Sequence, residues 1–262
     1  MGSASRTALG AGIAALAAAK GVTLATGEEL LAAARAIDSS AQLRALLADP
    51  TLDPKERGSL VNKVFGSLGS SATELLGTLT ASRWSNPNEL VDGIEEIGIR
   101  AIAQSESGSD IVGEIFAVER AVSSDPELEL ALGSKLAAPA AKAAVVSRLL
   151  AQQGSPATTA IVRHLVQSAR GRRIGALLRR TAAIVADVSG TVIATVTVAA
   201  PLTASQQDSL IADLTARFGR EPRIQYLTDP AVIGGVRVRV GDTVIDGTIA
   251  ARLADLRLQL AG

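Results

Sequence analysis

The stretch of this chain whose residue types most resemble a ligand site is residues 234–253, GGVRVRVGDTVIDGTIAARL. Glycine-rich turns beside helix starts often cradle phosphates, because backbone N–H groups there point at the anion. A phosphate or dinucleotide loop needs a helix N-terminus directly after its glycines, whereas GGVRVRVG leads into an alternating strand. We therefore interpret Gly234 and Gly235 as a bend, and Gly241 as a turn residue with positive φ.

Other candidates for chemistry are few. A Ser-His-Asp arrangement would have to use His164, the single histidine, which lies in the helical pattern TTAIVRHLVQSAR without a nucleophile elbow nearby. The chain has no cysteine, which excludes disulfides, thiolate metal sites and cysteine nucleophiles. Glu28-Glu29 and Glu95-Glu96 diverge around a helix, so neither is a ready pair of metal ligands. The sequence predicts no catalytic residue, no cofactor site and no metal site.

Charge is balanced overall but unevenly distributed. The chain has 26 basic and 26 acidic residues, yet residues 89–129 hold eleven acidic and two basic ones, and residues 142–180 hold eight basic and no acidic ones. Three interpretations stay open: helices that complement one another, a basic face for a partner protein, or nucleic-acid contact through residues 163–180. Zero net charge and 2% aromatic content argue against nucleic acid.

These residues must be positioned mainly by helices. Residues 3 to about 188 show helical patterns separated by short breaks, several of which supply an N-cap and a proline, as Asp53-Pro54 does. Hydrophobic residues make up 47% of the chain and are mostly Ala, Leu, Val and Ile, which favours closely packed helical bundles. The apolar run at residues 8–19 is too short to span a membrane, so we interpret it as a packed helix.

An internal repeat runs through this helical region at an offset of 85 residues. RAIDSSAQLRALL (residues 35–47) aligns with RAVSSDPELELAL (residues 120–132), and GSSAT with GSPAT. Breaks and apolar positions coincide without a gap, so we infer two copies of one helical bundle that overlap at residues 88–104. Two copies are too few for a solenoid.

The pattern changes after residue 188. Residues 191–202 and 223–227 are rich in strand formers, and VRVRV (residues 236–240) alternates strictly before a two-residue turn. A helix between the first two strands and a last helix at residues 249–260 complete the order β-α-β-β-β-α. The expected fold is mainly α, with two tandem helical bundles (residues 1–95 and 96–188) and a small α+β C-terminal domain (residues 189–262).

Residues 228–260, TDPAVIGGVRVRVGDTVIDGTIAARLADLRLQL, closely resemble the C-terminal signature of the ATP synthase delta subunit family. This family includes the mitochondrial oligomycin sensitivity-conferring protein. The matching positions are Asp229, Pro230, Gly234, Gly235, Gly241, Asp242, Asp246, Gly247, Arg252 and Leu253. Upstream, AIAQSESGSDIVGEIFAVERAVSSDPELELAL and LVQSARGRRIGALL resemble the start and end of the family's helical domain. Residues from about 90 onward thus cover an ordinary delta subunit, and the first copy resembles the extra bundle of long actinobacterial forms.

The resemblance implies a non-catalytic stator subunit of an F-type ATP synthase, with one copy per complex. In the family, the helical domain binds N-terminal segments of alpha subunits on the F1 head, and the C-terminal domain binds b subunits of the peripheral stalk. The stator holds the head still, so that proton transport drives ATP synthesis. The resemblance also implies a peripheral position on the cytoplasmic face of the bacterial cell membrane, with no membrane span and no cofactor.

The family pattern describes one helical copy, so the partner of each copy is open. We expect the second copy to hold an alpha segment, because it joins the C-terminal domain directly. The first copy is expected to hold another alpha segment or to brace the stalk. The alternative function is a nucleic-acid or regulatory binding module that uses residues 163–180. The ten signature residues are expected to serve structure or interaction.

Overall fold

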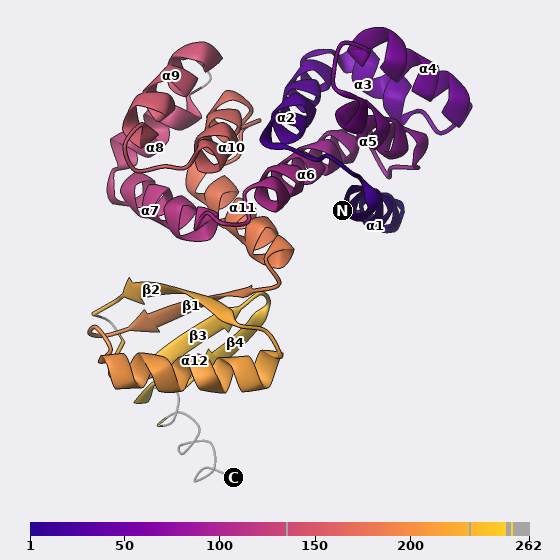
Figure 1. Ribbon diagram of the computed structural model, residues 1–262. Helices are drawn as coiled ribbons and strands as arrows, with labels where there is room; N and C mark the ends of the chain where they lie inside the picture. The colour runs from indigo at the N-terminus through magenta and orange to yellow at the C-terminus, as the bar shows by residue number, and fades with distance from the viewer. Residues whose placement is uncertain (135, 231, 250–252, 254–262) are drawn as a thin grey trace. The chain divides into compact units, whose positions relative to one another are not determined.

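The computed structural model describes residues 1–134, 136–230, 232–249 and 253 (Figure 1). They form a helical unit, Met1–Val185, and a C-terminal unit, Ala186–Gly262. The helices are α1 (Ser3–Ala18), α2 (Leu24–Ser39), α3 (Ala41–Ala48), α4 (Pro54–Phe65), α5 (Ser70–Ala81), α6 (Pro87–Ser105), α7 (Ile111–Ser124), α8 (Pro126–Gly133), α9 (Pro139–Leu150), α10 (Pro156–Gln167), α11 (Ile174–Val188) and α12 (Ala204–Phe218). The expected mainly α fold with a small α+β module at its C-terminal end is confirmed.

Several helices begin where the sequence pattern places a break. At four of them a polar N-cap side chain accepts a hydrogen bond from the first turn, and a proline follows it. These pairs are Asp53-Pro54, Asn86-Pro87, Asp125-Pro126 and Ser155-Pro156. The cap satisfies a backbone N–H that has no partner inside the helix, and proline lacks the N–H that would be unpaired at that position.

The repeat is visible in the helix bounds. Helices α3 and α8 differ by 85 residues at both ends, and so do α4 and α9. We call α1–α6 the first bundle and α6–α11 the second bundle, because α6 ends one series and begins the other. It packs against α1, α2, α3 and α5, and also against α10. The expected boundary between residues 95 and 96 falls inside this single helix. The division into residues 1–95, 96–188 and 189–262 stays a prediction.

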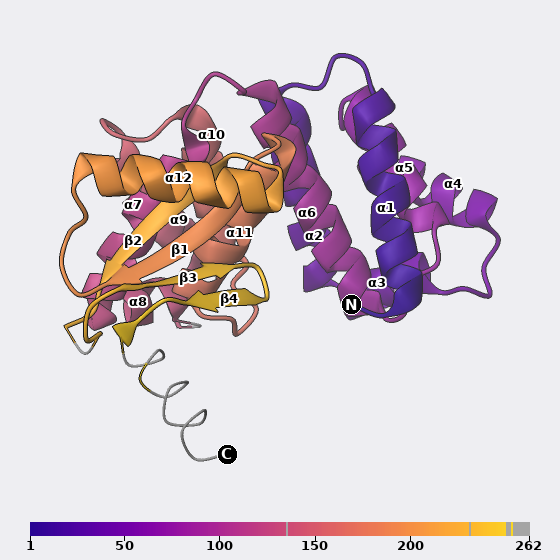
Figure 2. The same ribbon diagram turned by 90° about the horizontal axis from the view of Figure 1, so that it is seen from below.

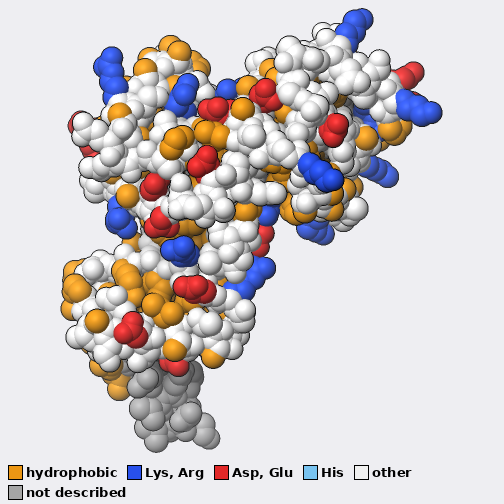
Figure 3. All heavy atoms as spheres, viewed as in Figure 1, with side chains coloured by type: hydrophobic (Ala, Val, Ile, Leu, Met, Phe, Trp, Pro, Cys, Tyr) orange, Lys and Arg blue, Asp and Glu red, His pale blue; other side chains and the backbone are white. Residues whose placement is uncertain are grey.

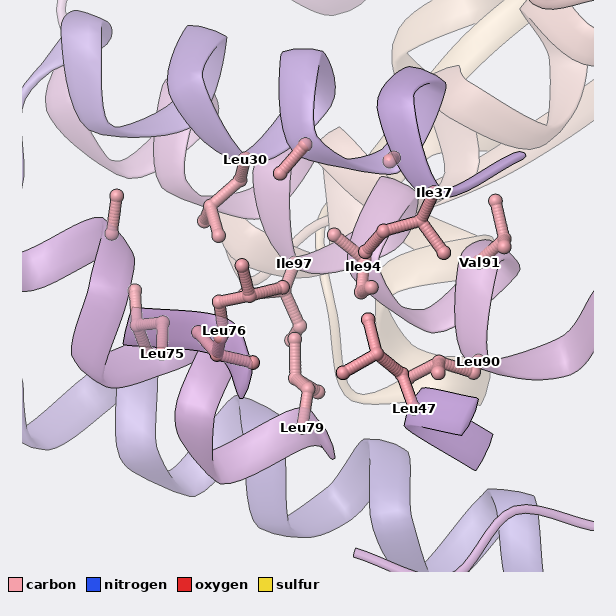
Figure 4. Close-up of a cluster of buried hydrophobic side chains, with 14 of the residues drawn as sticks. Leu30, Ile37, Leu47, Leu75, Leu76, Leu79, Leu90, Val91, Ile94 and Ile97 are labelled. Atoms are coloured by element: carbon pink, nitrogen blue, oxygen red, sulfur yellow. The ribbon is translucent and has the colours of Figure 1, made fainter. Parts of the chain in front are cut away.

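The core of the first bundle is an apolar cluster to which all of α1–α6 contribute, and Figure 4 shows a part of it from α2, α3, α5 and α6. Its labelled members are Leu30, Ile37, Leu47, Leu75, Leu76, Leu79, Leu90, Val91, Ile94 and Ile97, none more than 2% exposed. Each such side chain contributes about 1.5–3 kcal/mol by leaving water. Helices α2 and α6 approach closely, because a Cβ at Gly27 would lie 2.7 Å from the carbonyl oxygen of Gly98.

Within its described residues, the C-terminal unit contains a four-stranded sheet with α12 lying along it (Figures 1 and 2). Its strands are β1 (Val192–Val198), β2 (Pro222–Thr228), β3 (Val236–Val240) and β4 (Thr243–Asp246), in the spatial order β2-β1-β3-β4. Strands β1 and β2 are parallel, and the other two pairs are antiparallel. Leu214 of α12 packs with alternate residues of β1 and β3. The expected β-α-β-β-β order is confirmed. The expected last helix, residues 249–260, lies largely outside the described residues.

Candidate interaction surfaces of the helical unit

An apolar groove of about 450 Å³ opens in the second bundle between α7, α8, α9 and α10. Ten of its lining side chains are aliphatic: Ala117, Val118, Ala121, Val122, Leu128, Leu132, Val146, Leu149, Leu150 and Val162. The others are Asp110, Gly113, Glu114 and Gln153. We call this feature the apolar groove.

The floor and the mouth of the apolar groove differ in exposure. On the floor, Leu132, Val146 and Val162 are 5%, 2% and 1% exposed, so the packed bundle holds them in place. At the mouth, Ala121 is exposed and Leu149 is 59% exposed. A large exposed aliphatic side chain above a fixed apolar floor is typical of a surface that accepts a partner helix.

One end of the apolar groove is acidic. Asp110 caps α7 by accepting a hydrogen bond from the N–H of Gly113 at 3.2 Å. The carboxylate of Glu114 accepts from the N–H and the hydroxyl of Ser155, at 2.9 and 2.7 Å, which ties α7 to the start of α10. Partial burial raises the pKa of Glu114, but hydrogen bonds from Thr158 and Ser155 outweigh it and lower this pKa. None of the fourteen lining residues is basic, so the groove favours a ligand with apolar and cationic groups.

The first bundle differs from the second in several side chains around the corresponding space. At an offset of 85 residues, Val122, Leu150 and Gln153 correspond to Ile37, Phe65 and Leu68. Ile37 and Phe65 are 0% and 7% exposed, and Leu68 packs against their core. Three positions run the other way, since Val118, Leu149 and Val162 correspond to Ala33, Val64 and Gly77. The two bundles share helix positions but differ in which of these positions carry the larger side chains.

A second feature joins the two bundles through buried charge. His164 on α10 is 1% exposed, and its Nδ1 lies 2.8 Å from Nη1 of Arg35 on α2. Arginine is only a donor, so Nδ1 accepts and the neutral imidazole carries its proton on Nε2. That Nε2 lies 3.6 Å from Oε2 of Glu95 on α6, just beyond hydrogen-bond distance. One imidazole thus links three helices.

Glu95 is the acidic centre of this feature and is 5% exposed. Nη2 of Arg172 lies 3.2 and 3.0 Å from its two carboxylate oxygens, and Nη2 of Arg170 lies 3.2 Å from Oε2. Burial raises the pKa of Glu95, but His164 and Arg172 outweigh it and lower this pKa to about 2. Burial chiefly lowers the pKa of His164, and the cations Arg35 and Arg172 add to this against the opposing Glu95.

Arg170 completes the network from the segment after α10. Its φ is +49°, in the left-handed region that side-chain-bearing residues rarely adopt. Its guanidinium contacts Asp92 and lies 3.9 Å from Asp38 of α2. We call Arg35, Asp38, Asp92, Glu95, His164, Arg170 and Arg172 the charge seam. A strained backbone held by several carboxylates indicates that this geometry is fixed by its surroundings.

Half of the basic tract pairs with carboxylates inside the helical unit. Besides Arg170 and Arg172, Arg180 lies 3.5 Å from Glu96, and Arg179 pairs with Glu119. Four residues of the basic tract thus contact carboxylates of the acidic tract, which favours the interpretation of complementary helices. On the face shown in Figure 3, Lys and Arg side chains are interspersed with Asp and Glu.

The signature glycines of the C-terminal unit have the backbone roles expected of them. Gly234, Gly235 and Gly241 have φ values of +65°, +78° and +56°, so the bend and the turn are confirmed. A Cβ at Gly235 would lie 2.4 Å from the carbonyl oxygen of Gly247, so the chain passes too closely for a side chain there. Gly247 donates its N–H to the carbonyl of Val236 at 2.9 Å.

The other signature residues lie mostly in turns, apart from Asp246 at the end of β4. The N–H of Asp229 donates to the carbonyl of Val198 at 2.9 Å, and Pro230 and Asp242 are exposed. Asp246 accepts from the N–H and hydroxyl of Thr248 at 3.0 and 2.7 Å, and from Nε of Arg237 at 3.1 Å. Leu253 is 55% exposed, and Arg252 lies outside the described residues. Whether the signature also serves interaction stays a prediction.

Reasoning from the sequence did not identify the apolar groove or the charge seam. The signal for the seam was present in the acidic and basic tracts. No sequence pattern indicated the groove, because its lining residues have the same apolar spacing as residues of an ordinary core.

Within the described residues, no group of three or more His, Asp or Glu side chains could hold a metal ion. No helix of that part of the chain is both long and apolar enough to cross a membrane.

Comparisons with known proteins agree with the signature. Residues 99–260 match the family model described as ATP synthase delta (OSCP) subunit. An ATP synthase subunit delta of Leifsonia xyli subsp. xyli is 48% identical over 264 residues, covering 100% of both chains. One from Streptomyces avermitilis is 36% identical and covers 89% of this chain and 88% of its own. A chain in a cryo-EM structure of the Toxoplasma gondii mitochondrial ATP synthase hexamer is more distant, with 23% identity and a TM-score of 0.42 over 64% of this chain and 95% of its own.

Proposed function

The chain belongs to the ATP synthase delta (OSCP) subunit family, and from this we propose that it is the stator subunit linking the F1 head to the peripheral stalk. A delta subunit is a structural part of ATP synthase and not a catalytic one. Its proposed task is to hold the head still against the rotor, on the cytoplasmic face of the bacterial cell membrane, with one copy per complex. That task requires cohesive helices and surfaces for partner helices.

The apolar groove is the observation that carries the head side of this proposal. We assign it to the amphipathic N-terminal segment of an alpha subunit. A helix that lays apolar side chains over Val118, Ala121 and Leu149 would cover the exposed aliphatic mouth. A basic residue near one end of that helix would face Asp110 and Glu114. The second bundle is therefore the proposed alpha-binding copy.

The stalk side of the proposal rests on the C-terminal unit, which is assigned to the b subunits. Ile233 and Val244 are 69% and 52% exposed there, and β4 is an edge strand of the sheet. Exposed aliphatic side chains beside a sheet edge are features of a surface that a partner covers.

A matched pair of substitutions tests the head side. Ala121 and Ala36 are equivalent in the repeat, and both are exposed alanines on helices, so either tolerates glutamate without loss of folding. Ala121→Glu puts an unpaired carboxylate at the mouth of the groove. We expect about tenfold weaker binding of a synthetic alpha N-terminal peptide, measured by fluorescence anisotropy. Ala36→Glu is the control and should bind as the parent does. Equal affinities for both variants would remove the groove from the proposal.

The nucleic-acid alternative is separated by affinity purification of the tagged chain. The stator function requires alpha, beta and b subunits to co-purify. Recovery of RNA or DNA at moderate salt, without those subunits, would instead support the module that uses residues 163–180. Arg170, Arg172, Arg179 and Arg180 already contact carboxylates inside the helical unit, so phosphates would have to compete with them.

A further inference from the structure

We propose that the charge seam fixes the first bundle to the second as one rigid body, through a neutral His164 that joins Arg35 of α2 to Glu95 of α6. The proposal goes beyond the assignment of partners, since it concerns how the extra bundle is held. The first bundle would then follow every movement of the second and not move about a hinge.

Two connections at different places are needed to fix one body to another. Helix α6 is the first, because both bundles share it. One helix alone would leave the bundles free to splay about its axis. The second connection is the contact of α2 with α10, where Arg35 meets His164. Helix α2 belongs to the first bundle and α10 to the second. Their contact therefore prevents the two bundles from rotating relative to each other about the axis of α6.

The neutral Nε2–H tautomer is the only form of His164 that suits both neighbours. Nδ1 must accept from Arg35, and Nε2 faces the Glu95 carboxylate, which can only accept. A protonated imidazole would place two cations 2.8 Å apart and leave Arg35 without its acceptor. An apolar residue would leave the half-buried Arg35 without its acceptor, while Glu95 would keep only Arg170 and Arg172. A partly buried cation that loses its hydrogen bond favours opening to water.

The charged groups that act on the imidazole are Arg35 of α2, Glu95 of α6 and Arg172 after α10. Next to these three lie Glu28 and Asp38 on α2, Asp92 on α6, Arg163 on α10 and Arg170 after α10. Among the described residues, His164 Nε2, Arg170 Nε and Arg172 Nη1 are buried without a hydrogen-bond partner. Because several buried polar atoms of this network already lack hydrogen-bond partners, the loss of further hydrogen bonds would be costly. The network is therefore stable only while its members keep their positions.

The cysteine-free sequence allows a direct measurement of rigidity. Ser59→Cys on α4 and Ala144→Cys on α9 are exposed, repeat-equivalent sites in the two bundles, and can carry a pair of spin labels. Double electron–electron resonance on the full chain at pH 7.5 should give one narrow distance distribution. His164→Leu should broaden it into several populations. His164→Gln keeps one acceptor and one donor, and should restore a narrow distribution.

Arg173→Gln is the control, because Arg173 is an exposed cation in the same segment and lies outside the charge seam. It should leave the distribution narrow. Circular dichroism checks that each variant is folded, and if His164→Leu is not, Arg35→Met, which removes the donor to Nδ1, replaces it and should broaden the distribution. A broad distribution in the parent at pH 7.5 would overturn the proposal. So would a narrow one in folded His164→Leu, or in Arg35→Met where it replaces that variant.

Discussion

The two helical bundles follow the same plan but differ in how they are filled. In the first, the indole N–H of Trp84 donates to the carbonyl of Leu79 at 2.7 Å, and Arg57 donates to three carbonyls at the end of α5. The equivalent residues in the second bundle are Ala169 and Lys142, smaller or with fewer hydrogen bonds. The two copies therefore share one helix plan, but these two anchoring side chains belong to the first copy and the apolar groove belongs to the second.

The substitution expected to have the largest effect on stability, Trp84→Ala, tests whether the first bundle is the better packed copy. Trp84→Ala removes a side chain that is 4% exposed and loses its hydrogen bond. We expect a loss of about 3–5 kcal/mol in the free energy of unfolding, measured by urea denaturation. The control is Ala169→Gly at the equivalent site, which should cost about 1 kcal/mol or less. Similar losses at the two sites would contradict the contrast between the bundles.

The second-largest expected effect is a fall in the free energy of unfolding when acid protonates groups of the charge seam. The folded-state pKa of Glu95, about 2, is below its ordinary value of 4.5, so its contribution is present above pH 4.5 and lost as the pH falls toward 2. The pKa of His164 is also lowered, so its contribution is complete above pH 6.5 and declines below. The acid-sensitive part should be on the order of 3 kcal/mol for Glu95.

Urea midpoints measured across pH check this expectation. In Glu95→Gln the decline between pH 4.5 and 2 should be much shallower than in the parent, because the titrating carboxyl is gone. Glu28→Gln, on α2 near the seam, is the control and should keep the parent's slope. A parent curve that stays flat below pH 6.5 would show that the seam adds nothing to stability.

The smallest effect sharpens the contrast at the apolar groove. Leu150→Phe with Gln153→Leu gives the second bundle the side chains that the first has at those positions. The filled groove should raise the free energy of unfolding by about 0.5–2 kcal/mol and weaken binding of the alpha peptide. The reverse exchange, Phe65→Leu with Leu68→Gln, is the matched variant and should lower stability without affecting peptide binding. Tighter peptide binding by the filled groove would place the alpha site elsewhere.

Local chemistry explains why so much of the fold could be predicted. Asp53-Pro54 and Asn86-Pro87 act within one helical turn, and the alternation in VRVRV depends only on neighbouring residues. The 85-residue repeat required only comparison of the chain with itself. The groove and the seam depend on packing between distant segments. Nothing near His164 indicates that Arg35, 129 positions away, meets its imidazole. Likewise, Leu150 reads as a core residue until the space beside it is known.

The shared helix has a consequence for dissecting the chain. A truncation that starts at Asn86 keeps the cap and the first proline of α6, so the helix can still begin correctly. The same cut strips away α1–α5, and Leu90, Ile94 and Ile97, now buried, would become a bare apolar stripe. Such a fragment would self-associate unless those three side chains were replaced by polar ones. The first bundle therefore consists of five helices packed on a helix that the second bundle also needs. Those five helices cannot be removed without exposing the apolar side chains of α6.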